Sequence, residues 1–152
     1  MQDVHPKAGN LVARRRNVEV DFLDSNILVY ASDARDKAKQ QKCVEIVAAA
    51  LRNGTATIST QVLFEYANVA LTKLNLRPAV VRQQIQIISS LPTIVQSAML
   101  AARAIEIRDI YGIAFWDSAI VAAAEEARCD RILSEDFSGG QPYCGILVHN
   151  PL

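Results

Sequence analysis

Four acidic residues occupy places where ordinary surface charge is not expected. Asp24 and Asp136 each lie just beyond a short apolar stretch that favours a β-strand, whereas Glu65 and Asp117 each fall on the apolar side of a predicted helix. Carboxylates held close together raise each other's pKa, and a divalent cation removes that repulsion. Oxygen ligands without His or Cys suit a hard ion, Mg²⁺ or Mn²⁺. Such a site supports metal-assisted hydrolysis of a phosphodiester bond.

The stretch that carries the first of these acids, residues 18–30, organises the predicted fold. Val18, Val20 and Phe22 alternate with acidic residues, which predicts a strand over 18–22. By the period-two rule Asp24 should leave this strand on the same face as Phe22. The carboxyl end of a strand is where open α/β sheets bind ligands. A helix is expected to start after the polar tip Asp24-Ser25-Asn26.

The remaining chain alternates between helical and strand patterns. Apolar spacing and capping signals predict helices over residues 38–53, 60–73, 77–91, 98–110 and 113–127. Short β-favouring stretches predict strands at 55–59, 93–95, 131–133 and 146–149. This alternation indicates an α/β sandwich around a mainly parallel sheet. The carboxyl ends of parallel strands meet at one edge, so that edge would collect both strand-end acids, and flanking helices could present the other two there.

Each acid also has a simpler structural role open to it. Asp24 can serve only as the cap of the turn that follows it, and Asp117 can be a helix N-cap. Asp136 can be an ordinary loop acid. Glu65 is hardest to place in this way, because an inward-facing Glu needs a partner. Of the neighbouring residues, Trp116 is expected in the core.

Bulk composition suits one domain with a real core. The chain has 152 residues, of which 51% are hydrophobic and 21% charged. We expect a single domain over 18–152, preceded by a flexible basic tail at 1–17 that lacks the apolar centre of a signal peptide. No apolar run approaches the length of a membrane helix.

Lys plus Arg equals Asp plus Glu, at 16 each, so no bulk attraction to nucleic acid is implied. Three cysteines without a paired motif favour a reduced, cytoplasmic setting.

These motifs, taken together in this order and spacing, resemble the PIN-domain family, and within it the VapC-type toxins of bacterial and archaeal toxin–antitoxin systems. The resemblance covers about residues 18–148. It rests on Leu23-Asp24-Ser25-Asn26, Val62-Leu63-Phe64-Glu65, Trp116-Asp117-Ser118-Ala119-Ile120 and Leu133-Ser134-Glu135-Asp136-Phe137.

The resemblance implies a three-layer α/β/α fold with a parallel sheet and a four-carboxylate active site. It implies an endoribonuclease dependent on Mg²⁺ or Mn²⁺, with Asp24, Asp117 and Asp136 holding the metal and Glu65 completing the shell or positioning water. Ser25, Asn26 and Ser134 would be supporting polar groups. It further implies a homodimer, an RNA substrate and neutralisation by a small antitoxin.

Two other functions remain open. One is a nuclease of the same fold that acts in RNA processing without an antitoxin. The other is a catalytically silent module that binds RNA or protein, although the intact acid set weighs against it. An aspartate-nucleophile phosphatase fits poorly, because Asp21 and Asp24 are three residues apart where that chemistry needs Asp-x-Asp.

Overall fold

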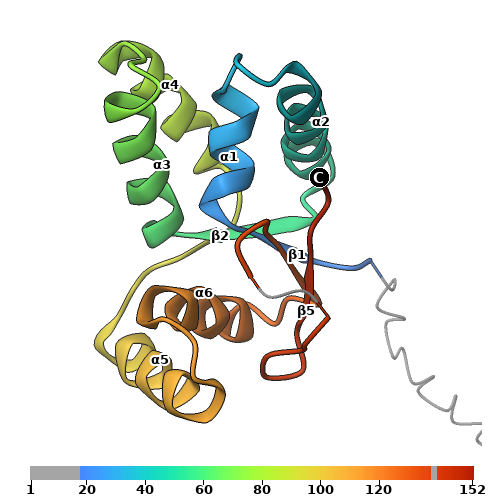
Figure 1. The fold of residues 1–152 in the computed structure, drawn as a ribbon, viewed down its shortest axis with the longest axis vertical. Helices are drawn as coiled ribbons and strands as arrows, with labels where there is room; N and C mark the ends of the chain where they lie inside the picture. Colours follow the sequence, from blue (N-terminus) through green and yellow to red (C-terminus); the bar gives the residue numbers. More distant parts are fainter. Residues whose placement is uncertain (1–17, 138–139) are drawn as a thin grey trace, which may run out of the picture.

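The computed structural model describes residues 18–137 and 140–152 (Figure 1). The expected tail, residues 1–17, lies outside the described residues. Every helix and strand expected from the sequence is present. The strands are β1 (Asp21–Leu23), β2 (Ala56–Ser59), β3 (Thr93–Ile94), β4 (Arg131–Leu133) and β5 (Leu147–His149). The helices are α1 (Ser25–Ser32), α2 (Lys37–Asn53), α3 (Thr60–Thr72), α4 (Pro78–Ile88), α5 (Ala98–Tyr111) and α6 (Phe115–Glu126).

The five strands form one parallel sheet in the order β3-β2-β1-β4-β5. β1 is central, and Phe22 lies opposite Thr57 of β2 and Ile132 of β4. The chain therefore runs outward from β1 through β2 to β3, then returns to the other side of β1 as β4. Where strand order reverses in this way, the connections after the two strands diverge and leave a crevice at the carboxyl edge of the sheet.

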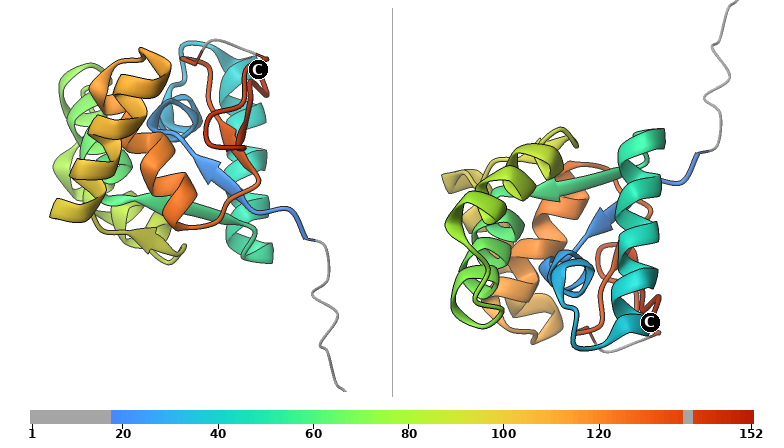
Figure 2. Two further views of the ribbon diagram at one scale, coloured as in Figure 1. Left: turned by 90° about the horizontal axis from the view of Figure 1, so that it is seen from below. Right: turned by 90° about the horizontal axis from the view of Figure 1, so that it is seen from above.

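Helices cover both faces of the sheet (Figures 1 and 2). One layer contains α1 to α4, in which α1 packs on α2 and α3, and α3 packs on α4. The other layer contains α5 and α6, which pack on each other. The predicted three-layer sandwich with a parallel sheet is thus confirmed.

The core lies between the central strands and these helices. Phe22, Ile58 and Ile132 of the sheet are fully buried. In α6 every residue from Ser118 to Ala124 is buried, and four of these seven are alanines. Small side chains let this helix approach both the sheet and α5 closely. In the described part of the chain, no helix is long and apolar enough to cross a membrane.

The first strand begins later than its alternating pattern predicted. Val18 lies before β1 and is 53% exposed. The main chain of Val20 is still held, because its N–H donates to the Asp130 carboxylate at 2.8 Å and its carbonyl accepts from the Asp130 N–H at 2.8 Å. Helices cover both faces of β1, so Leu23 and Asp24 are buried as well as Phe22. Alternation along a doubly covered strand does not separate an inner from an outer face.

Local capping residues set the helix ends. The Ser59 hydroxyl accepts from the Val62 N–H at the start of α3, and the Ser97 hydroxyl caps α5 in the same way. Helix α5 ends at Gly112, whose φ of 66° lies in the left-handed region that glycine adopts without strain. This ending allows α6 to start three residues later and carry Asp117 back toward the sheet edge.

Candidate functional site

Asp24 ends the central strand and begins α1. Its Oδ1 accepts a hydrogen bond from the Ser25 N–H at 2.7 Å, and its Oδ2 accepts one from the Ser134 hydroxyl at 2.7 Å. The side chain is therefore the N-cap of α1, as the simpler alternative proposed. It is also only 5% exposed and faces the end of β4, so the capping and the inward placement occur together.

Burial is the main influence on the Asp24 carboxyl group. Removing the carboxylate from water raises its pKa from 3.8 to about 6, and the hydrogen bonds from Ser134 and Ser25 limit that rise. The charges of Glu65 and Asp136 raise the pKa further. These two acids are thus close enough to Asp24 to affect it electrostatically, as the predicted carboxylate cluster requires.

Glu65 approaches the same edge of the sheet from α3. Its Oε2 accepts from the Ser25 hydroxyl at 2.7 Å, and its Oε1 accepts from the Gln61 side-chain amide at 2.8 Å. An inward Glu requires a hydrogen-bond partner, and Glu65 has two. They are the Ser25 hydroxyl at the start of α1 and the Gln61 amide one turn earlier in α3. Gln61 is buried, and its amide also donates to the Trp116 carbonyl at 3.1 Å, which ties α3 to the start of α6.

Asp117 lies in the first turn of α6. The N-cap of this helix is Ala114, so the interpretation of Asp117 as a cap is wrong. Partial burial raises the Asp117 pKa most, followed by the negative charges of Asp136 and Glu65. No hydrogen bond from a described residue contributes to that shift. Among the four acids, Asp117 therefore has the carboxylate that is least engaged in hydrogen bonds with the described residues.

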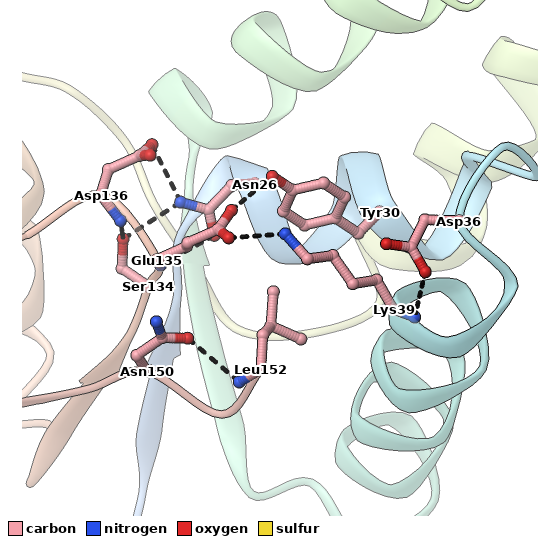
Figure 3. A network of polar contacts seen from close by, with 9 residues as sticks. All are labelled: Asn26, Tyr30, Asp36, Lys39, Ser134, Glu135, Asp136, Asn150 and Leu152. Carbon is pink, nitrogen blue, oxygen red and sulfur yellow. Dashed lines mark hydrogen bonds and ion pairs between the residues drawn. The ribbon is translucent and has the colours of Figure 1, made fainter.

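Asp136 is held by the polar groups that precede it (Figure 3). The Asn26 amide donates to the Asp136 Oδ2 at 2.9 Å and to the Ser134 hydroxyl oxygen at 3.1 Å. The Asp136 N–H also donates to that hydroxyl oxygen, at 3.1 Å. Ser134 is fully buried and links Asp24 to Asp136 through one oxygen atom. The three predicted supporting residues therefore all contact one or more of the acids.

Beside Asp136 lies a second group that the sequence analysis missed (Figure 3). Glu135 accepts from the Lys39 ammonium at 2.7 Å and from the Tyr30 hydroxyl, and these contacts lower its pKa. Lys39 also lies 4.6 Å from the centre of the Tyr30 ring. No sequence pattern links residues about a hundred positions apart.

The contact between Gln61 and Glu65 could have been predicted from the sequence, because Gln61 stands four residues before Glu65 on one helix face.

Trp116 differs from its predicted place in the core, since 59% of it is exposed. The continuous buried stretch of α6 begins only at Ser118, two residues further on. The ring of Phe115 packs edge-on against Trp116, with the ring centres 5.3 Å apart. The first turn of the helix thus places an acid inward and an indole ring in contact with solvent.

The donor set fits a hard divalent cation, because all four site acids offer oxygen ligands and electrostatics couples them. The described residues nevertheless contain no group of three or more acidic, His or Cys side chains already placed around one metal position. Asp24, Glu65 and Asp136 instead accept hydrogen bonds from serine, glutamine and asparagine side chains. Mg²⁺ in proteins commonly keeps several waters and takes only one or two carboxylates, which this arrangement can supply.

The fold is similar to those of solved structures, of which three are described here. A crystal structure of VapC20 from Mycobacterium tuberculosis, described as a sarcin–ricin loop cleaving toxin, has a TM-score of 0.63 and 17% identity, covering 76% of this chain and 91% of that one. A toxin–antitoxin complex from Klebsiella pneumoniae has a TM-score of 0.64 and 21% identity, covering 87% and 98%. VapBC2 from Rickettsia felis, bound to a DNA fragment from its promoter, has a TM-score of 0.61 and 20% identity, covering 86% and 98%.

Comparison with curated protein sequences gave no match. The family model for the PIN domain matches residues 22–138, which include all four acids and most of the chain. The parallel sheet, the acids at its carboxyl edge and this match agree, and the chain belongs to the PIN-domain family.

Proposed function

We propose that this protein is a metal-dependent endoribonuclease and the toxin of a toxin–antitoxin pair. One observation carries the proposal: a buried carboxylate, Asp24, is coupled to Glu65 and Asp136 at the sheet edge where the strand order reverses. Burying like charges together is unfavourable unless the site receives a cation. Membership of the PIN-domain family and likeness to toxin structures support the choice of RNA as substrate.

Asp24, Asp117 and Asp136 would hold Mg²⁺ or Mn²⁺, and Glu65 would complete the shell or position the attacking water. A bound divalent cation supplies Lewis-acid stabilisation of negative charge on phosphate and lowers the pKa of water. The protein's own part is to fix the acids. Ser134 holds Asp24 and the Asp136 main chain, while Ser25 joins Asp24 to Glu65 through its N–H and its hydroxyl.

The proposed partners follow from the toxin assignment. Two similar structures are described as a toxin–antitoxin complex and as VapBC2 bound to promoter DNA, which supports a cognate antitoxin here. An arginine from that partner would suit the carboxylate cluster, because its planar fork matches carboxylate geometry. We also propose a homodimer acting in the cytoplasm.

A cleavage assay tests the nuclease proposal. The protein should cleave single-stranded or loop RNA, because unstacked bases leave the backbone accessible. This activity should require Mg²⁺ or Mn²⁺ and should be lost in excess EDTA. Asp117→Asn should lose at least tenfold in rate, whereas Asp109→Asn, at an exposed position on α5, should keep it. Undiminished cleavage in EDTA would rule out the metal mechanism.

Co-purification tests the toxin assignment separately. Expressed with the product of the adjacent gene, the protein should be recovered as a complex that no longer cleaves RNA. Recovery of free protein whose activity ignores that gene product would leave a PIN-domain nuclease that acts without an antitoxin.

A further inference from the structure

An aromatic cleft adjoins the acidic site. Residues from the first turns of α5 and α6 line it, and it has a volume of about 340 Å³. Trp116 and Phe115 line it from α6, with Gln96, Ser97 and Leu100 from the start of α5. Trp116 is 59% exposed, which leaves a large aromatic side chain in contact with solvent beside this cleft.

Hydrogen bonds connect this cleft to the carboxylates. The Gln96 side-chain amide donates to the Gln61 Oε1 at 2.9 Å. The Gln61 amide in turn donates to the Glu65 carboxylate at 2.8 Å and to the Trp116 carbonyl at 3.1 Å. Trp116 and Asp117 are also consecutive residues. A group seated in the cleft would therefore lie beside the acids and not on a remote surface.

The lining restricts the chemistry of the occupant. None of the residues lining the cleft carries a charge, and aromatic rings, apolar side chains and small alanines form most of its walls. Gln96 and Ser97 add polar groups to the lining. A flat, neutral ring with hydrogen-bonding edges fits these walls, and an unpaired nucleobase is such a ring. A phosphate would find no cation there.

Overall charge gives stacking further importance. The chain has zero net charge, so long-range attraction of the RNA backbone is weak. Stacking on aromatic side chains needs no such attraction and accepts any base. We propose that Trp116, supported by Phe115, stacks an unpaired base next to the scissile phosphate and so positions the RNA. This inference rests on RNA being the substrate.

Trp116 is the only tryptophan in the chain, so its fluorescence reports on the cleft directly. In EDTA, which prevents cleavage, a short single-stranded RNA should quench this emission. The same oligonucleotide with abasic positions keeps the phosphates but lacks the bases, and should quench little. Equal quenching by both oligonucleotides, or none by either, would overturn the proposal.

Substitutions give a second measurement, using the anisotropy of a dye-labelled RNA. Trp116→Ala should weaken binding by about 5- to 150-fold, the range expected for one stacked base. Trp116→Phe should recover much of that loss. Gln61 bonds to the main-chain carbonyl of Trp116, so both variants can keep that contact. Ile110→Ala, at an exposed apolar position on α5, is the matched control and should bind RNA normally.

The kinetic outcome separates stacking from damage to the site. Trp116→Ala should raise KM more than it lowers kcat, and should melt within a few degrees of the parent. A fall in kcat alone would contradict the proposal. If the emission changes with protein concentration and not with RNA, a second copy of the chain covers the cleft and the proposal fails. RNA-dependent quenching without any cleavage would instead refute the proposed nuclease function.

Discussion

At the scale of single residues, Ser134 decides how the acids are held. Its hydroxyl donates to Asp24 and accepts from both the Asn26 amide and the Asp136 N–H, which uses its one donor and two acceptor positions. Asp24 accepts this bond while being almost wholly buried. The hydrogen bond lowers the Asp24 pKa, but burial has the larger effect and leaves the pKa near 6.

The raised pKa gives metal-free stability a defined pH dependence. The folded state keeps the Asp24 proton up to about pH 6, whereas the unfolded chain releases it near 3.8. Stability from this residue is therefore lost as pH rises across that window. We compare the free energy of unfolding of Asp24→Asn with that of the parent in EDTA. As the pH rises from 4 to 7, this difference should shift in favour of the variant by about 2 to 3 kcal/mol, since each pKa unit is worth about 1.4 kcal/mol.

Denaturant titrations of both proteins at several pH values measure this difference. Asparagine loses one contact with Ser134, but that loss is independent of pH and shifts the whole curve. Asp109→Asn, at an exposed position on α5, is the matched control for the removal of one carboxylate. A constant difference between Asp24→Asn and the parent would mean that Asp24 titrates as an ordinary carboxyl group.

At the scale of elements, Gln61 joins three segments that are distant in the chain. Its side chain contacts Glu65 within α3, the Trp116 carbonyl in α6 and Gln96 before α5. A buried amide of this kind fixes how α6 approaches α3. The position of Asp117 relative to Glu65 follows from that approach.

Replacing Gln61 by methionine keeps the shape of the side chain and removes all three hydrogen bonds. Since Glu65 and the Trp116 carbonyl then lose a donor, we expect a loss of about 1 to 3 kcal/mol of stability. Gln41→Met is a matched control, because Gln41 donates to Glu45 four residues later on the exposed face of α2. It should change stability by less than about 0.5 kcal/mol. Equal effects in thermal melts would show that Gln61 does not organise the site.

At the scale of the whole molecule, the sheet topology concentrates negative charge at one edge. The connections after β1 and β4 bring Asp24 and Asp136 there, while α3 and α6 add Glu65 and Asp117. The chain as a whole is neutral, so this edge is a local imbalance. A divalent cation that binds only the folded state should neutralise this negative charge and stabilise the fold.

Thermal melts with metal and with EDTA should therefore distinguish the parent from Asp117→Asn. In EDTA the variant should melt at the parent's temperature or above it, because burial and its acidic neighbours disfavour the Asp117 charge. Mg²⁺ or Mn²⁺ should stabilise the parent by about 2.7 kcal/mol at a hundredfold excess over Kd. The variant should lose most of that gain, and an unchanged metal-induced shift would exclude Asp117 as a ligand.

The sequence by itself determined the features that depend on nearby residues. The helix starts at Ser59 and Ser97 and the end at Gly112 were predictable, because capping involves groups within a few positions of one another. Strand and helix periods gave the layer architecture, and the parallel order placed Asp24 and Asp136 at one edge. The four candidate acids came from that same reasoning.

Only the tertiary structure decided which side chains meet and which remain exposed. Ser134 bonds to Asp24 across 110 positions, and Glu135 finds Lys39 across 96, contacts that no local pattern encodes. Trp116 has a large aromatic side chain of the kind expected in a core. It is nevertheless exposed, because burial depends on where α6 meets its neighbours. Packing also set the Asp24 pKa, since the loss of water around a carboxylate is a property of the folded site and not of the strand that carries it.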